Sequence, residues 1–289
     1  MTFDTNTVLF GHDPTPRLIA FEIAGQDQVR VFARKNGEIT STISPFTPFL
    51  LLADTRLLTN FRGDGEIEAL QGEAFFRYLA RFPSLGELTK AREHLQQVSG
   101  KTATAPDAPY FYVSDPIQQY LLLSGQTHFL GMHFHDLARL QMDIEVYCQA
   151  GFEFPNPSRE EDRIIAIALS DSTGWETVLS GREMTEPEML REMVRLIRER
   201  DPDVIEGHNF FRFDLEYIEA RAKRHGVQLP LGRDGSPLKG HASRMQIAER
   251  AITYRKYEIF GRHIVDTWIL AQHYDVGARN LESYGLKDV

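Results

Sequence analysis

Two acidic side chains in residues 140–147 (LQMDIEVY) have a spacing that suits a divalent metal site. Side chains alternate between the faces of a β-strand, so Asp143 and Glu145 share one face while the apolar residues between them share the other. Two residues of extended chain span about 7 Å, so both carboxylates can reach one divalent cation. The alternative interpretation of an isolated D-x-E pattern is an edge strand with a solvated face.

A third acid, Asp214, lies about seventy residues further on, in the segment 203–214 (DVIEGHNFFRFD). This segment has the pattern of a short apolar strand, a turn at Gly207 and the start of a helix. Asn209 is a suitable N-cap, which would place Asp214 in the first turns, where the helix dipole favours a negative charge. The sequence therefore predicts that three carboxylates converge where a strand end meets a helix start. A capped surface helix with an acidic first turn is the alternative.

The elements around these acids indicate an α/β domain. The expected elements are, in chain order, strands over 140–147, 163–169 and 175–179, a helix with a capping box at Thr185 and Glu188 and an apolar stripe at Leu190, Met193, Val194 and Ile197, a strand at 204–205, and a helix over 213–225 closed by Gly226. A basic segment with an Asp234-Gly235 turn interrupts this order. Strands at 257–260 and 263–265 then lead to a helix, for which Asp266 is interpreted as the N-cap rather than a metal ligand.

The first part of the chain carries strand and helix signals and no catalytic motif. The expected elements are strands over 17–22, 29–34 and 46–52, an Asn36-Gly37 hairpin turn, helices over 72–82 and 84–97, the second with a Ser84/Glu87 capping box, and a helix over 117–125. Residues 99–116 are rich in Ser, Thr, Ala and Pro, which indicates a connecting segment. We therefore expect a small α+β domain over residues 1–136 and a second domain over residues 137–289.

Composition excludes several classes of protein. The chain has 289 residues, of which 42% are hydrophobic and 25% charged, as in globular proteins. It contains no apolar run of about 20 residues and no secretion signal, so we expect a cytoplasmic protein without a membrane partner. Its single cysteine, Cys148, excludes an internal disulfide. The net charge is −9, yet residues 221–262 carry ten basic and three acidic residues, a local charge of +7, which fits either a nucleic-acid contact or a solvated face.

The D-x-E strand and the N-x-x-x-F-D helix start together resemble the first two exonuclease motifs of family B DNA polymerases. The segment YLLLSGQTHFLGMHFHDLARLQMDIE resembles the approach to the first motif, and LGRDGSP, IFGRHIVDTWILAQHY and LESYGLKDV resemble segments C-terminal to the second. The resemblance implies a ribonuclease-H-like exonuclease domain, a mixed sheet flanked by helices, preceded by a small α+β N-terminal domain. It also implies a 3′→5′ proofreading exonuclease acting on single-stranded or primer-template DNA, in a protein that carries further polymerase domains.

By this resemblance, the site holds two divalent cations, Mg²⁺ or Mn²⁺. Asp143 would bridge them, Glu145 would help to hold the one that activates water, and Asp214 would support the second. Asn209 and Phe210 match the flanks of the second motif and are the expected substrate-binding residues.

The family's third motif, Y-x-x-x-D, supplies one more acid. Tyr284 and Asp288 match its spacing, but LESYGLKDV resembles the segment before that motif, so we expect the true motif beyond Val289 and a chain that is truncated and nearly inactive. Two alternatives remain, a non-catalytic nucleic-acid-binding or structural domain that keeps the fold, and a free-standing nuclease that acts on RNA.

Overall fold

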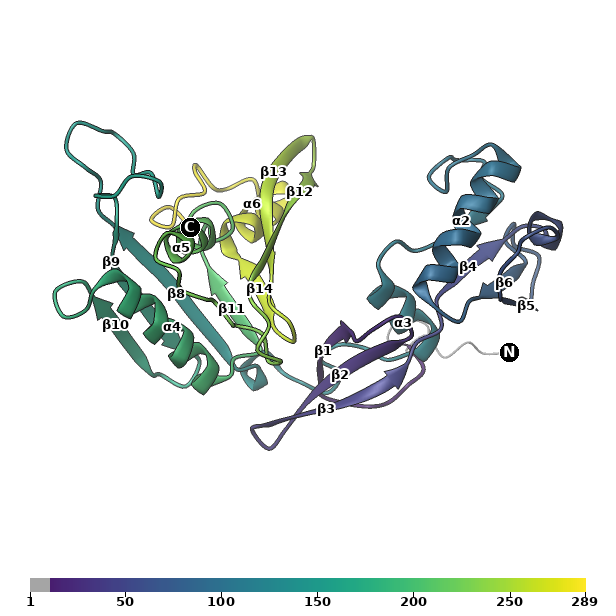
Figure 1. Cartoon of the computed structure of the whole chain (residues 1–289), viewed down its shortest axis with the longest axis horizontal. Helices are drawn as coiled ribbons and strands as arrows, with labels where there is room; N and C mark the ends of the chain where they lie inside the picture. Colours follow the sequence, from purple (N-terminus) through teal and green to yellow (C-terminus); the bar gives the residue numbers. More distant parts are fainter. Residues whose placement is uncertain (1–10) are drawn as a thin grey trace. The chain divides into compact units, whose positions relative to one another are not determined.

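The computed structural model describes residues 11–289, and residues 1–10 lie outside that description. The chain forms two compact units, one ending at Met132 and one running from His133 to Val289 (Figure 1). The sequence-based boundary lies after residue 136. None of the helices in the described residues has the length and apolar composition needed to cross a membrane.

The first unit is a small α+β structure with two antiparallel sheets, ordered β1-β2-β3 and β5-β6-β4-β7. Its elements are β1 (Leu18–Ile23), β2 (Gln28–Lys35), β3 (Glu38–Pro45), β4 (Phe49–Leu52), the 3₁₀ helix η1 (Thr55–Leu58), β5 (Glu66–Ala69), β6 (Tyr78–Arg81), α2 (Leu85–Ser99), β7 (Tyr110–Phe111) and α3 (Pro116–Ser124). The predicted Asn36-Gly37 turn is confirmed, since both residues have positive φ, at 53° and 84°, and join β2 to β3.

The structure corrects one prediction in this unit. Residues 72–82 were expected to form a helix, but β6 occupies their second half and pairs with β4 and β5. Every second side chain in this stretch packs into the same core, namely those of Tyr78, Ala80 and Phe82. This period of two is typical of a strand, so the segment forms a strand rather than a helix. The helix start predicted at Ser84 is confirmed, because α2 begins after Ser84, whose Oγ accepts the N–H of Glu87 at 3.2 Å. The predicted capping box is only half formed, because the Glu87 carboxylate pairs with Lys90 instead of Ser84. Within the expected connecting segment, β7 pairs with β4.

The second unit is built on a five-stranded mixed sheet ordered β10-β9-β8-β11-β14. Its elements are the 3₁₀ helix η2 (Phe134–Asp136), β8 (Arg139–Val146), β9 (Ile164–Asp171), β10 (Glu176–Ser180), α4 (Glu186–Arg200), β11 (Val204–Gly207), α5 (Asp214–Arg224), β12 (Lys239–Ile247), β13 (Arg250–Glu258), β14 (His263–Asp266) and α6 (Thr267–Ala278). The pairs β8–β9 and β9–β10 are antiparallel, whereas β11 is parallel to both β8 and β14. This is the ribonuclease-H-like arrangement expected from the sequence.

Both α4 and α5 pack on one face of this sheet, so the sheet has two unlike faces. The buried residues of β8, Leu140, Met142 and Ile144, share a core with these helices. All four residues of the predicted apolar stripe of α4 are buried, and the Thr185/Glu188 capping box is present. The other face of β8 carries Asp143 and Glu145, both exposed.

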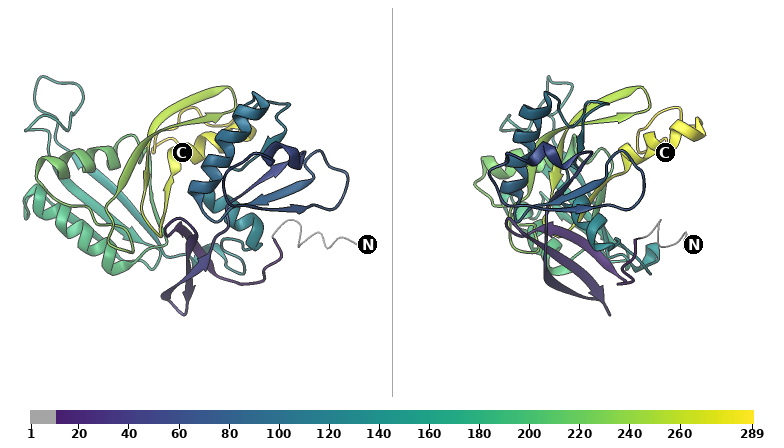
Figure 2. Two further views of the ribbon diagram at one scale, coloured as in Figure 1. Left: turned by 45° about the vertical axis from the view of Figure 1, so that its right-hand side comes forward. Right: turned by 90° about the vertical axis from the view of Figure 1, so that its right-hand side faces the viewer.

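The basic segment after α5 forms a two-stranded antiparallel hairpin of β12 and β13, which extends away from the sheet (Figure 2). The sequence predicted a turn at Asp234-Gly235, and Gly235 there has φ 81°. The strand expected over 257–260 is only partly observed, because β13 ends at Glu258 and an isolated bridge joins Ile259 to Arg262.

Candidate active site

The strand β8 presents two acids on its open face, as its alternation predicts. Asp143 and Glu145 are exposed, whereas Met142 and Ile144 are buried. Directly opposite residues of antiparallel strands share a face. Asp143 pairs with Ala168 and Glu145 with Ala166 in β9. These neighbours are small, so the two carboxylates stand on a surface with room for a ligand.

The third acid, Asp214, is the first residue of α5 and is 2% exposed. Its Oδ1 accepts the backbone N–H of Ile144 at 3.1 Å. The pairing of β11 with β8 ends at Glu206 and Gln141, so Asp214 meets β8 beyond the end of that ladder. Ile144 stands between Asp143 and Glu145 in the strand. The helix start predicted from the sequence therefore reaches the acidic strand.

The turn before α5 differs from the prediction. Asn209 is not the N-cap of α5, since that position is occupied by Phe213 without a side-chain hydrogen bond. Asn209 instead has φ 58°, and its carbonyl accepts the N–H groups of Arg212 and Phe213 at 3.2 and 3.0 Å. Asparagine tolerates this left-handed conformation better than most residues. Phe210 is fully buried in the core. The substrate-binding role expected for Asn209 and Phe210 stays a prediction.

The acids influence one another electrostatically. Burial raises the pKa of Asp214 to about 7, and the negative charge of Asp143 contributes to the increase. Loss of hydration and the charge of Glu145 also raise the pKa of Asp143. The carboxylate oxygens of these acids are hard ligands, and their negative charges repel one another. A divalent cation bound between them would relieve this repulsion and favour the charged forms of the acids. The donor set therefore fits such an ion.

The three acids do not form a complete metal site in this conformation. Among residues 11–289, no group of three or more His, Cys, Asp or Glu side chains is gathered closely enough to hold a metal ion. The charge of Asp143 raises the pKa of Asp214, and the charge of Glu145 raises the pKa of Asp143, so these electrostatic interactions link the three acids in series. Convergence of all three around shared cations stays a prediction.

Beside the acids, a line of polar side chains crosses the same face of the sheet. Glu206 of β11 accepts from Arg139 Nη1 at 2.7 Å and from Gln141 Nε2 at 3.1 Å. The Oγ of Ser170 in β9 donates to Gln141 Oε1 at 3.1 Å. These bonds fix the strand positions that precede Asp143. Sequence reasoning missed them, although the alternation of Arg139 and Gln141 with Asp143 was available as a signal.

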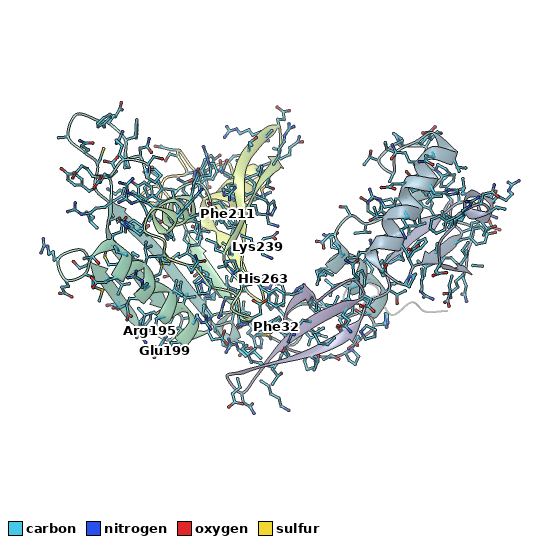
Figure 3. All side chains as sticks on the ribbon, in the orientation of Figure 1. Phe32, Arg195, Glu199, Phe211, Lys239 and His263 are labelled. Atoms are coloured by element: carbon cyan, nitrogen blue, oxygen red, sulfur yellow. The ribbon has the colours of Figure 1, made fainter. Side chains whose placement is uncertain are left out.

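Asp266 caps α6, as predicted, with Oδ1 accepting the N–H of Trp268 at 3.0 Å. The sequence did not reveal its second bond, in which Oδ2 accepts the N–H of Phe211 at 3.0 Å. Phe211, which is labelled in Figure 3, lies in the turn that leads to Asp214. The centre of its ring lies 5.5 Å from that of Tyr254 in β13. The residue that caps α6 therefore also holds the turn that leads to α5.

Tyr284 and Asp288 have other partners. The Tyr284 hydroxyl donates to Asp275 Oδ2 at 3.0 Å, and its carbonyl contacts His208 Nε2 at 2.7 Å. The exposed Asp288 accepts a hydrogen bond from the Ser283 hydroxyl. These contacts favour the view that Tyr284-x-x-x-Asp288 is a coincidental match, which stays a prediction.

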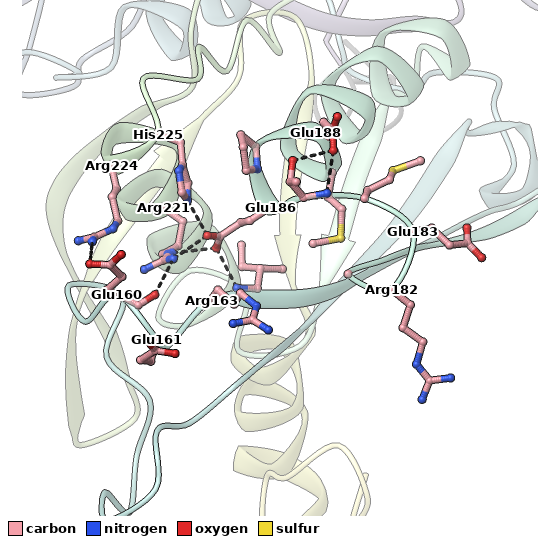
Figure 4. Close-up of a pocket in the computed structure, with 16 residues that line it drawn as sticks. Glu160, Glu161, Arg163, Arg182, Glu183, Glu186, Glu188, Arg221, Arg224 and His225 are labelled. Atoms are coloured by element: carbon pink, nitrogen blue, oxygen red, sulfur yellow. Dashed lines mark hydrogen bonds and ion pairs between the residues drawn. The ribbon is translucent and has the colours of Figure 1, made fainter.

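Several of the basic residues that give residues 221–262 their local charge of +7 form ion pairs within the fold. Arg221 pairs with Glu186 at 2.6 Å, and both side chains are almost completely buried. This pair, joined by His225, borders a cavity of about 640 Å³ between α4 and α5 (Figure 4). Arg233 and Arg262, whose side chains are almost completely buried, also form ion pairs with the partly exposed Asp201. The hairpin also carries exposed cations, among them Lys239 and Arg250.

Comparison with known proteins accounts for this arrangement. Residues 170–289 match the model of the family described as DNA polymerase family B, exonuclease domain. The matched residues make up less than half of the chain, and with the relatives below they support an exonuclease region of a family B DNA polymerase. Exonuclease domains of this family use divalent cations in general.

Relatives of this family extend the similarity upstream. A DNA polymerase of Thermococcus litoralis is 29% identical over 237 residues, which cover 73% of this chain and 13% of that protein. DNA polymerase 1 of Pyrococcus abyssi is 37% identical over 130 residues, or 42% of this chain and 16% of that protein. The structure of the family B DNA polymerase from Pyrobaculum calidifontis matches 90% of this chain and 37% of that chain with TM-score 0.63 and 22% identity. The chain therefore spans well under two thirds of these relatives and shares the fold.

Proposed function

We propose that this chain is a 3′→5′ exonuclease module that hydrolyses the terminal phosphodiester of a DNA strand. The observation that supports it most directly is the hydrogen bond from Ile144 N–H to Asp214 Oδ1, at 3.1 Å. It joins the helix start to the strand that bears Asp143 and Glu145, which is where a family B exonuclease needs its acids. The match of residues 170–289 to the exonuclease domain of that family supports the same activity.

The chain's own residues have separable roles in this proposal. Two divalent cations, Mg²⁺ or Mn²⁺, supply Lewis acidity toward water and phosphate when bound. Asp143 and Glu145 would hold them from the open face of β8, where Ala166 and Ala168 leave room for the phosphate. Asp214, fixed by its bond to Ile144, would hold the second cation from the side of α5.

The substrate and partners belong to the same proposal. Single-stranded or primer-template DNA would approach the open face of the sheet, and Lys239 and Arg250 of the hairpin are exposed cations that suit its phosphates. The matched relatives are DNA polymerases, so the remaining polymerase domains are the proposed partners of this module. We place the protein in the cytoplasm, together with its DNA substrate.

A second candidate is a non-catalytic nucleic-acid-binding or structural domain with the same fold. It is favoured by one observation, namely that the described acids form no complete group for a metal. The two candidates differ in whether the acids bind cations that change the substrate. DNA binding without metal dependence or strand shortening would favour this second function.

The test measures the length of 5′-labelled single-stranded DNA with Mg²⁺, Mn²⁺ or EDTA, together with Mn²⁺ binding by calorimetry. We expect metal-dependent shortening from the 3′ end, weak in the 289-residue chain, and its loss together with most Mn²⁺ binding in Asp143→Ala. Asp143 is exposed, so this variant keeps its fold. The matched control is Glu216→Ala, an exposed acid in the first turn of α5. Undiminished shortening by Asp143→Ala, or shortening in EDTA, contradicts the proposed function.

A further inference from the structure

Asp266 uses its two carboxylate oxygens for two different elements. Oδ1 accepts the N–H of Trp268 inside α6, and Oδ2 accepts the N–H of Phe211 in the turn between β11 and α5. The side chain is 4% exposed. A buried carboxylate that receives two backbone N–H groups holds both in place, because moving either one leaves a buried polar group unpaired.

The residue next to Asp266 holds the same turn at its other end. Asp266 is the last residue of β14 and lies beside Gly207, the last residue of β11. The Thr267 hydroxyl donates to the Gly207 carbonyl at 3.1 Å and contacts His208 Nδ1 at 3.0 Å. Thr267 thus fixes the start of the turn, and Asp266 fixes Phe211 near its end.

Comparison with another cap in this chain shows that the second bond is not required for capping. Asp115 caps α3 with a single oxygen, Oδ1, which accepts the N–H groups of Ile117 and Gln118 within that helix. Asp266 could cap α6 in the same way. Its Oδ2 instead reaches a turn 55 residues earlier in the chain.

We propose that Asp266 is a positioning residue for Asp214, acting through the backbone of Phe211. The inference rests on the proposed function, because Asp214 matters for catalysis only if it holds a cation. Phe210 connects the turn to α5, since its carbonyl accepts the N–H of Leu215 at 3.0 Å. Fixing Phe211 therefore fixes the first turn of α5 and, with it, the carboxylate that meets Ile144.

Two substitutions separate positioning from capping. Asp266→Asn keeps one acceptor oxygen for the two N–H groups of Trp268 and Phe211, so one of them faces an amide donor. Asp266→Ala removes both bonds. Thr185→Ala is the matched control, because it removes the N-cap of α4 in the same unit and leaves the turn before α5 untouched.

The primary measurement is the Mn²⁺ dissociation constant of the 289-residue chain, from calorimetry or electron paramagnetic resonance. Loss of a residue that orients a metal ligand weakens binding by about 10–100-fold, and we expect this range for both Asp266 variants. Faster hydrogen exchange at the Phe211 amide should accompany it. Thr185→Ala should lower the melting temperature without changing Mn²⁺ affinity.

Three outcomes overturn the inference. If wild type binds Mn²⁺ and Asp143→Ala does not, while Asp266→Asn binds like wild type, the positioning role fails and the proposed function stands. If Thr185→Ala weakens Mn²⁺ binding as much as Asp266→Asn does, the effect is one of general stability. If wild type binds no Mn²⁺ at all, both the proposed function and the positioning role are wrong.

Discussion

The backbone N–H of Ile144 donates to Asp214 Oδ1 at 3.1 Å, so a carboxylate takes the place that a neighbouring strand's carbonyl would occupy. The ladder between β8 and β11 ends at Gln141 and Glu206. Asp214 continues it from the start of a helix. The same carboxylate that would hold a cation thus also completes the hydrogen bonding of the sheet.

Asp214→Asn should stabilise the metal-free protein at neutral and alkaline pH. The folded-state pKa of Asp214 is about 7, above its ordinary value of 3.8, because burial and Asp143 disfavour its charge. The folded state therefore binds more protons between these values, and the free energy of unfolding falls as pH rises from about 4 through 7. Asparagine can still accept from Ile144 and carries no charge. Urea titrations at several pH values measure the difference.

The expected gain from Asp214→Asn is small near pH 4 and reaches a few kcal/mol at pH 8, at about 1.4 kcal/mol per pKa unit. The same variant should lose Mn²⁺ affinity, since a charged ligand is replaced. A stability difference that does not depend on pH would show that the charge of Asp214 is not the cause.

Arg221→Met should destabilise the second unit strongly. Arg221 and Glu186 form a pair whose side chains are 2% and 4% exposed. Removing Arg221 takes away the cation beside the buried Glu186 carboxylate and leaves it with His225 and the N–H of Ile164 as partners. Such losses cost about 3–5 kcal/mol. Arg224→Met is the control one turn away on α5, where the pair with Glu160 is largely exposed, and about 0–1 kcal/mol is expected. Similar melting temperatures for the two variants would contradict the structural role of Arg221.

Gly207→Ala should destabilise the turn after β11. A Cβ at Gly207 would lie 2.4 Å from the Phe210 ring and 2.9 Å from the Met142 carbonyl, so neighbouring groups must move. Overpacking of this kind costs about 1–3 kcal/mol. Gly277→Ala in α6 meets nothing within 4 Å and should stabilise instead, by about 0.4–1 kcal/mol. Chemical denaturation of both variants checks the opposite signs.

Asp288→Ala should leave Mn²⁺ binding unchanged, whereas Glu145→Ala should weaken it. Asp288 is exposed and accepts from Ser283, while the charge of Glu145 acts on Asp143. Calorimetric titration of the two variants compares them directly. Loss of Mn²⁺ affinity in Asp288→Ala would show that this residue belongs to the metal site and that the spacing from Tyr284 is functional.

The sequence predicted the sheet of the second unit well where its signal was local. The alternation around Asp143 and the apolar stripe of α4 each determine a buried face by themselves. The order of strands and helices then constrains the topology to a few choices. The resemblance to a known family selected one of them.

Other features depend on contacts that no local pattern encodes. The N-cap assignment of Asn209 failed because the turn needed a residue with positive φ, a requirement set by how β11 meets α5. The helix expected over 72–82 failed because β4 and β5 offered partners to β6. The hairpin of β12 and β13 has polar residues along most of its length, so its strands lacked an apolar signal.

The two kinds of acid in this site should evolve at different rates once activity is no longer selected. Asp143 and Glu145 are exposed, so a descendant that had lost catalysis could exchange either of them without harm to its fold. Position 214 must still supply an acceptor for the buried N–H of Ile144. Asp or Asn should therefore persist at position 214 in descendants that have lost the activity, because the fold still needs this acceptor.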